Sequence, residues 1–190
     1  SIGLLDASNY ATTTPNYNLS VTNNFIKDES SFLLMKGGDL FNIRHNTVLN
    51  GQQGSLSGSS TTVKLISSTV PATNWTMKDN IVAYSAFGID VAVPPNTVAA
   101  GFPGGVFLNN VVVQNNTANS GTIHCGASSE WGVNAALCPV QTAFSGVGFT
   151  DLANNNMRLL NTSPYYHAAS DGTDPGVDWD ALLAALGNNV

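Results

Sequence analysis

The chain carries very little charge. Of its 190 residues only 9% are charged and only six are Lys or Arg, which gives a formal net charge of -6. Binding to a phosphate backbone needs clustered basic side chains, so this composition argues against a nucleic-acid partner. The chain also lacks an apolar run of about 18 residues, the length that a membrane-spanning helix requires. We therefore expect neither nucleic acid nor a membrane span.

Cysteine is equally scarce. The two cysteines, Cys125 and Cys138, bracket a segment rich in small residues. We expect a disulfide there, and closing a loop of this size would contribute about 3 kcal/mol of stability. A metal site that uses the adjacent His124 is the weaker alternative, because no CxxC pair or second nearby histidine completes a ligand set.

The uncharged residues of the chain indicate where the protein is located. Hydrophobic residues make up 43% of the chain, and the polar residues are dominated by Asn, Ser, Thr and Gly, a composition common in secreted β-rich proteins. The chain begins at Ser1 rather than at a methionine, as a mature or excised segment would. These features predict an extracellular or cell-surface location.

A short phrase recurs four times along the chain. Each copy is an alternating half-buried strand that leads into a polar pair ending in Asn and then into an apolar strand. The copies are LSVTNNFI (19–26), FNIRHNTV (41–48), WTMKDNIV (75–82) and GVFLNNVV (105–112). Their second polar residues, all Asn, lie 22, 34 and 30 residues apart, which is typical of a solenoid with loop insertions.

Asparagine suits the corner that these repeats predict. It tolerates the left-handed backbone conformation, and its amide can hydrogen-bond to its own turn and to the Asn of the next coil. We therefore predict a ladder of stacked amides with a structural role, formed by Asn24, Asn46, Asn80 and Asn110. By the same alignment, Trp75 matches Leu19 and Phe41 and should lie in the core.

The repeats divide the chain into three parts. We expect an opening segment over 1–18, β-helix coils with loop insertions over 19–170, and an acidic turn with a short capping helix over 171–190. The helix should occupy 178–186, with acidic residues at its N-terminus and Gly187 just past its end. No matching cap is visible before residue 19, so the chain is expected to be a fragment of a longer β-helix or to self-associate through that end.

Four runs carry a resemblance to a known family. They are FNIRHNTVLN (41–50), DNIVAYSAFGI (79–89), FPGGVFLNN (102–110) and the closing stretch from Val147 to Asp178. Together they resemble bacterial right-handed parallel β-helix repeat proteins of the pectate-lyase-like superfamily, over about Asn18 to Leu186. The likeness is greatest to the C-terminal part of larger secreted members. It implies an all-β fold, a right-handed parallel β-helix with a short C-terminal capping helix.

The enzymes of this superfamily have acidic calcium ligands beside an Arg or Lys base, or an adjacent Asp pair followed by His. Neither pattern can be assembled here, because Asp39, Asp79 and Asp90 are separated in the sequence. The remaining catalytic candidates are Arg44, His45 and Asp79. His45 occupies the position before the ladder Asn, so a turn residue is the favoured interpretation over a general base.

Sugar rings stack on exposed aromatic faces, and the superfamily usually binds glycans on a sheet face. Trp131 and Tyr84 are the candidate stacking residues, and Lys64 and Lys78 the candidate cations of that face. The alternative interpretation is that these lysines only keep a flat sheet face soluble.

The tail contains closely spaced carboxylates that could bind calcium, a cation that prefers oxygen ligands. They are Asp171, Asp174, Asp178 and Asp180, whose spacing does not match an EF-hand loop. No other cofactor is expected.

These observations together favour a secreted, non-catalytic module that binds polysaccharide or a cell-surface glycan. The first alternative is a fragment of a polysaccharide lyase or glycoside hydrolase, and the second is a structural subunit of an extracellular assembly.

Overall fold

A computed structural model describes residues 5–7, 16–27, 31–49, 61–83, 88–113 and 143–187. Within these ranges the chain is mainly β-structure, with three parallel sheets and a short helix near the C-terminus. The all-β prediction is confirmed in this form. None of the helices in the described ranges has both the length and the apolar character that crossing a bilayer demands.

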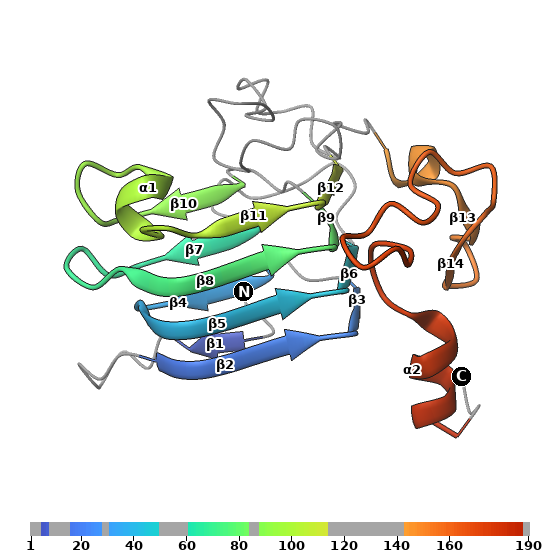
Figure 1. Cartoon of the computed structure of the whole chain (residues 1–190), viewed down its shortest axis with the longest axis horizontal. Coiled ribbons are helices and arrows are strands. Elements are labelled where there is room, and N and C mark those ends of the chain that lie inside the picture. Colours follow the sequence, from blue (N-terminus) through green and yellow to red (C-terminus); the bar gives the residue numbers. More distant parts are fainter. Residues whose placement is uncertain are drawn as a thin grey trace.

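Each parallel sheet has four strands (Figure 1). The first sheet contains β1 (Leu5–Ala7), β4 (Leu33–Met35), β7 (Val63–Leu65) and β10 (Ile89–Val91). The second contains β2 (Asn16–Thr22), β5 (Gly38–Arg44), β8 (Ala72–Lys78) and β11 (Val106–Leu108). The third contains β3 (Phe25–Lys27), β6 (Thr47–Leu49), β9 (Ile81–Ala83) and β12 (Val111–Val113).

The chain visits the three sheets in the same order four times. Each passage contributes one strand to the first, second and third sheets in turn, and every strand pairs in parallel with its counterpart in the next passage. The register in the second sheet places Leu19 opposite Phe41 and Phe41 opposite Trp75. The repeated phrases of the sequence therefore lie directly above one another.

The apolar side chains that alternate along these strands point into one interior. Phe41, Ile43, Trp75 and Met77 of the second sheet pack there against residues of the other two sheets. Trp75 has only 1% of its surface exposed and contacts the rings of Phe41 and Phe102, as the repeat alignment predicts. Burial of these large side chains is the main stabilising contribution to the stack.

A second core covers the outer face of the third sheet. Strands β9 and β12 are buried at every position, because their outward residues pack against the C-terminal segment, residues 143–187. That segment contains the 3₁₀ turn η1 (Phe144–Val147), the antiparallel pair β13 (Phe149–Asp151) and β14 (Asn156–Leu159), and α2 (Trp179–Ala185). Continuous apolar runs such as Ile81-Val-Ala and Val111-Val-Val are typical of strands that are buried on both faces.

The described residues include two short α-helices, which contact different sheets. Helix α1 (Val98–Gly101) follows β10, whereas α2 lies beside the third sheet (Figure 1). The side chain of Asp178 accepts a hydrogen bond from the Ala181 amide and so caps α2, close to the predicted start. Trp179 packs edge-on against Phe25 of β3, so α2 contacts the first passage of the chain.

The predicted asparagine ladder is present at the corner between the second and third sheets. The amide nitrogens of Asn24, Asn46 and Asn80 each donate to the side-chain oxygen of the next Asn, at 2.9, 2.9 and 2.8 Å. The same oxygens also accept from the backbone N–H groups of these residues. Three of the four side chains are buried, and their polar groups are satisfied within the ladder and by backbone carbonyls.

One detail of this prediction was wrong. The left-handed residues are not the ladder asparagines but the residues just before them: Asn23, His45, Asp79 and Asn109, with φ between 50° and 61°. The left-handed residue turns the chain, and this turn directs the following Asn inward. Asn, Asp and His are the non-glycine residues that adopt this conformation most readily.

We predict that an interior asparagine of the ladder, such as Asn80, stabilises the fold more than the terminal Asn24 does. Asn80→Ala leaves the side-chain amide and the backbone N–H of Asn46 without their acceptor and removes one of the two donors to the Asn110 oxygen, so it should lower the free energy of unfolding by about 3 kcal/mol. Asn24→Ala removes a terminal rung and should cost about 1 kcal/mol. Urea denaturation of both variants measures the difference, and equal losses would contradict a cooperative ladder.

Candidate functional site

The C-terminal segment crosses the corner at residues 168–178, which we call the covering segment. It runs along the left-handed residues from the last passage to the first. Asn109 donates to the carbonyl oxygen of Ala168 at 3.3 Å, and Asn23 accepts from the Asp178 amide at 2.6 Å. The corner side chains therefore face another part of the same chain rather than solvent alone.

Close packing holds the covering segment in place. The Gly176 amide donates to the carbonyl oxygen of Asp79 at 2.7 Å, and the Val177 amide donates to the Thr47 hydroxyl at 3.0 Å. Gly176 has φ +85°, and a Cβ atom there would lie 2.6 Å from the Thr47 hydroxyl oxygen and 2.7 Å from Ile81. Only glycine fits this position without a shift of its neighbours.

Asp79 is the buried centre of the site. Its side chain has no exposed surface. Its Oδ1 accepts from the Ser170 amide, and its Oδ2 accepts from the Ser170 hydroxyl, both at 2.6 Å. The Arg44 guanidinium donates to Oδ2 at 3.2 Å. A buried carboxylate is stable only when it is paired and hydrogen-bonded, and these contacts meet that requirement.

Asp171 is the second carboxylate of the site and, with 42% of its side chain exposed, is far more accessible than Asp79. Its Oδ2 is 2.9 Å from His45 Nε2 and 3.4 Å from Arg44 Nη2. His45 Nε2 is also 3.9 Å from Asp79 Oδ2. The site thus combines two carboxylates, one imidazole and one guanidinium, and the side chains of Arg44 and His45 are 28% and 18% exposed.

Hydrogen bonds tune the acidity of Asp171. The hydroxyl of Thr173 donates to Asp171 Oδ1 at 2.6 Å, and the Thr173 amide donates to the same oxygen at 3.1 Å. These bonds, with a smaller contribution from His45, hold the pKa of Asp171 well below its usual range, although desolvation acts against them. Asp171 is therefore a carboxylate anion at neutral pH.

An open cleft of about 350 Å³ adjoins the site. Strands β2 and β5, their corners and the covering segment line it. All eight lining residues are polar: Thr22, Asn23, Asn42, Arg44, His45, Asp171, Thr173 and Asp178. A ligand in this cleft would meet hydroxyl, amide, carboxylate, guanidinium and imidazole groups within a small space.

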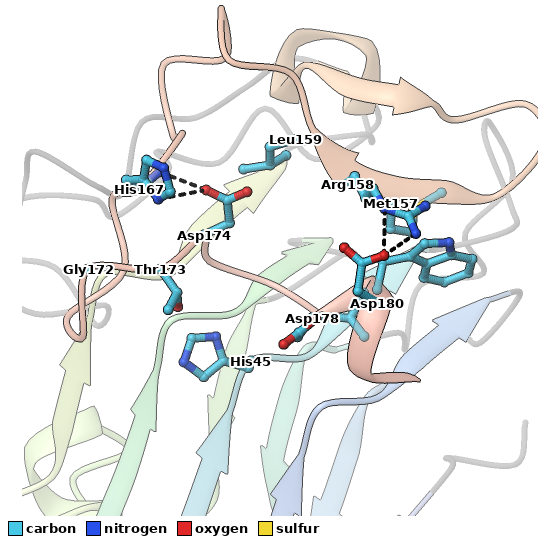
Figure 2. Close-up of a pocket in the computed structure, with 12 residues that line it drawn as sticks. His45, Met157, Arg158, Leu159, His167, Gly172, Thr173, Asp174, Asp178 and Asp180 are labelled. Carbon is cyan, nitrogen blue, oxygen red and sulfur yellow. Dashed lines mark hydrogen bonds and ion pairs between the residues drawn. The ribbon is translucent and has the colours of Figure 1, made fainter. Parts of the chain in front are cut away.

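A second pocket of about 270 Å³ lies between the covering segment, β14 and the start of α2 (Figure 2). His45, Thr173 and Asp178 line both cavities. In the second pocket Asp174 accepts a hydrogen bond from the His167 amide at 2.7 Å. Asp180 pairs with Arg158, whose Nε donates to it at 3.1 Å.

The structure brings the three catalytic candidates together. Arg44, His45 and Asp79 meet at two neighbouring corners, and Asp171, a calcium candidate in the sequence, joins them. The other three calcium candidates, Asp174, Asp178 and Asp180, hydrogen-bond to different partners along the covering segment and α2. The four tail carboxylates are therefore not gathered into one ligand set.

The two lysines that were predicted to bind glycan lie in different sheets. Lys78 lies in β8 of the second sheet, beside Arg44 in the register. Lys64 lies in β7 of the first sheet and pairs with Asp90 at 2.8 Å. Tyr84, Trp131, Cys125 and Cys138 lie outside the described residues, and their predicted roles stay predictions.

Sequence reasoning missed the contributions of Ser170 and Thr173 and the roles of Thr22, Asn23 and Asn42 in lining the cleft. The Asp171-Gly172-Thr173 turn was a local signal, because Asp and Thr at this spacing hydrogen-bond within a turn. The pairing of His45 with Asp171 across 126 positions has no local signal. It follows from the path that the C-terminal segment takes over the third sheet.

We predict that the buried charge of Asp79 stabilises the corner. Asp79→Asn keeps a residue that tolerates the left-handed conformation, as Asn23 and Asn109 do at equivalent corners. It removes the charge that Arg44 contacts, so unfolding in urea should become easier by about 2 kcal/mol. Asp90→Asn makes the same chemical change at an exposed ion pair with Lys64 and should alter stability by less than about 0.5 kcal/mol. Equal effects would show that the corner charge has no special role.

The acidity of Asp171 should depend on Thr173. Thr173→Val removes the hydroxyl and keeps the branched shape, so the pKa of Asp171 should rise toward its usual value. Carboxyl ¹³C NMR titration measures this change, with Thr150→Val on β13 as the control.

Because the pKa of Asp171 is lowered in the folded state, its ionisation makes the stability of the fold depend on pH. Ionised Asp171 stabilises the fold above about pH 4, the ordinary carboxyl value, and this stabilisation is lost as the pH falls through the folded pKa. Thr173→Val should therefore reduce the stabilisation near neutral pH and leave stability in strong acid unchanged. An unaltered Asp171 titration in Thr173→Val would refute this cause.

Comparison with known proteins identifies no relative of this chain. No protein-family model matches it, and neither a curated protein nor a solved structure shows significant similarity to it. A functional assignment therefore depends on the geometry of the chain's own residues.

Proposed function

We propose that this chain is a secreted right-handed parallel β-helix module of the pectate-lyase-like type that binds a neutral polysaccharide without cleaving it. The binding surface is the outer face of the second sheet together with the adjoining polar cleft. The observation that carries the proposal is the pair of polar rows on that face, which continue into a cleft lined only by polar residues.

The parallel register forms the rows. Ser20, Asn42 and Thr76 lie side by side across β2, β5 and β8. Thr22, Arg44 and Lys78 form the neighbouring row. Adjacent strands in a sheet are about 4.8 Å apart, so the first row presents hydroxyl and amide groups, and the second row hydroxyl and cationic groups, at regular short intervals.

Such groups match the chemistry of a sugar chain. Hydroxyl groups of a glycan both donate and accept hydrogen bonds, and Ser, Thr and Asn side chains do the same. Asn42 and Ser20 lie within hydrogen-bonding distance of each other at 3.4 Å, so they form a continuous polar surface. Figure 1 shows these strands on one broad face of the molecule.

The charge of the cleft favours a neutral ligand. Asp171 and Asp178 line it, and Asp79 lies buried beneath Arg44. These three carboxylates outweigh the single guanidinium of Arg44, and the whole chain carries a net charge of -6. A polyanionic glycan would be repelled here, whereas a neutral one would not.

The strand order supports the proposed architecture. Four passages through the same three sheets, all paired in parallel, are what one coil per passage would produce. Parallel strands connected through crossovers have a strong right-handed preference. A β-helix of this kind would expose the second sheet along its length as a binding face.

A specific observation favours a second candidate, a polysaccharide hydrolase or lyase. Arg44, His45 and Asp79 meet beside the cleft, and the imidazole is held 2.9 Å from Asp171. A histidine oriented by a carboxylate is a common general base. Against this role, Asp79 is buried and already hydrogen-bonded by Ser170 and Arg44.

Affinity electrophoresis tests the proposal directly. The chain should migrate more slowly in gels that contain a neutral glucan or mannan than in gels that contain polygalacturonate. Asn42→Ala and Lys78→Ala, on the second sheet, should each weaken retardation about fivefold, which corresponds to the loss of one hydrogen bond. Lys64→Ala, at an outward position of the first sheet, should behave as wild type.

The same samples separate binding from catalysis. Reducing ends and ultraviolet-absorbing unsaturated products are measured after incubation with each polysaccharide. Retardation without product agrees with the proposal, and product formation that His45→Asn abolishes would replace it with the enzyme. Absence of retardation in every gel, or equal effects of the Lys64 and Lys78 variants, would contradict the proposed face.

A further inference from the structure

Three potential ligand atoms converge beside the cleft. His45 Nε2, Asp79 Oδ2 and Asp171 Oδ2 all lie within 4.8 Å of one another, and no second group of this kind occurs among the residues that the structure describes. The Nε2 atom is 2.9 Å from Asp171 Oδ2 and 3.9 Å from Asp79 Oδ2. Tetrahedral zinc, with bonds of about 2.0–2.2 Å, separates its ligand atoms by about 3.3–3.6 Å. The observed distances fall on either side of this value.

The other oxygens of the two carboxylates are fixed by the covering segment. Asp79 Oδ1 accepts from the Ser170 amide, and Asp171 Oδ1 accepts from the Thr173 amide and hydroxyl. With both Oδ1 atoms held in this way, Asp171 Oδ2 lies 2.9 Å and Asp79 Oδ2 3.9 Å from His45 Nε2, and Asp79 Oδ2 also accepts from the Ser170 hydroxyl at 2.6 Å. Metal sites in proteins use such outer contacts to orient their ligands.

The guanidinium of Arg44 is the cation nearest to these oxygens, and its hydrogen bonds to them are weak. Arg44 Nη2 reaches Asp79 and Asp171 at 3.2 and 3.4 Å, which are long distances for charge-assisted hydrogen bonds. Its Nε atom is buried without a hydrogen-bond partner. Because Arg44 also lines the open cleft, its guanidinium can move outward when another cation takes its place.

From this geometry we infer that His45, Asp79 and Asp171 form a binding site for a divalent transition-metal ion, with Zn²⁺ the best suited. One imidazole and two carboxylates match the ligands of zinc, whereas calcium and magnesium prefer oxygen ligands throughout. The cleft supplies a path for the ion and room for water as a fourth ligand. His45 and Asp171 also line the cleft of the proposed glycan surface, whereas the two polar rows of the second sheet contain none of the three ligands.

Calorimetric titration of the full chain with ZnCl₂ alone, after treatment with EDTA, measures the binding. We expect one ion per chain. His45→Asn removes the imidazole and keeps a residue suited to the left-handed corner, so the affinity should fall at least about tenfold. The matched control is His167→Asn, because His167 also has positive φ but lies outside the ligand triangle, and its affinity should equal that of wild type. Arg44→Gln removes the competing cation and should tighten binding.

Histidine ¹⁵N NMR of the wild-type chain provides a test that needs no variant. Of the three histidines, His45 alone should show a large Nε2 shift when Zn²⁺ is added. The inference would be overturned by the absence of binding, by a shift at another histidine instead, by equal affinities of the His45 and His167 variants, or by weaker binding in Arg44→Gln. Because no glycan is present, failure here leaves the result of the electrophoresis unaffected.

Discussion

The hydrogen-bonded asparagine ladder is the constraint on which the corner of this protein depends. Each amide must turn inward to meet the next one, so the residue before it must adopt the left-handed conformation. Apart from glycine, the residues that adopt this conformation most readily are Asn, Asp and His, and residues of these three types occupy all four corner positions. A structural demand inside the corner thus produces a column of polar groups on its outer side.

Asp79 connects this column to the C-terminal segment. Its carboxylate and its carbonyl oxygen bind Ser170 and Gly176, while the two ends of the column, Asn109 and Asn23, bind the start and the end of the covering segment. The same contacts bury the outer face of the third sheet and form one wall of the cleft. Stability and the candidate site therefore have a common origin, and a change at Asp79 should affect both.

Local patterns in the sequence predict the repeating part of the fold well. Alternation identifies the strands of the second sheet, the recurring Asn predicts the ladder, and the alignment places Trp75 in the core. The site was predicted only in part, because Arg44, His45 and Asp79 come from two neighbouring repeats but Asp171 comes from a distant segment. No periodic signal specifies where a chain without repeats will pack. The unbroken apolar strands β9 and β12 were the one indication that something covers the third sheet.

Hydrogen exchange tests most directly whether the ladder and the covering segment act as one unit. The amides of Ser170 and Gly176 donate to Asp79, and the amide of Asn46 donates within the ladder. If the corner opens only as a whole, all three amides should exchange slowly and at similar rates under native conditions. Rapid exchange at Ser170 and Gly176 beside a protected Asn46 would show that the covering segment detaches independently, which would contradict the account of the site.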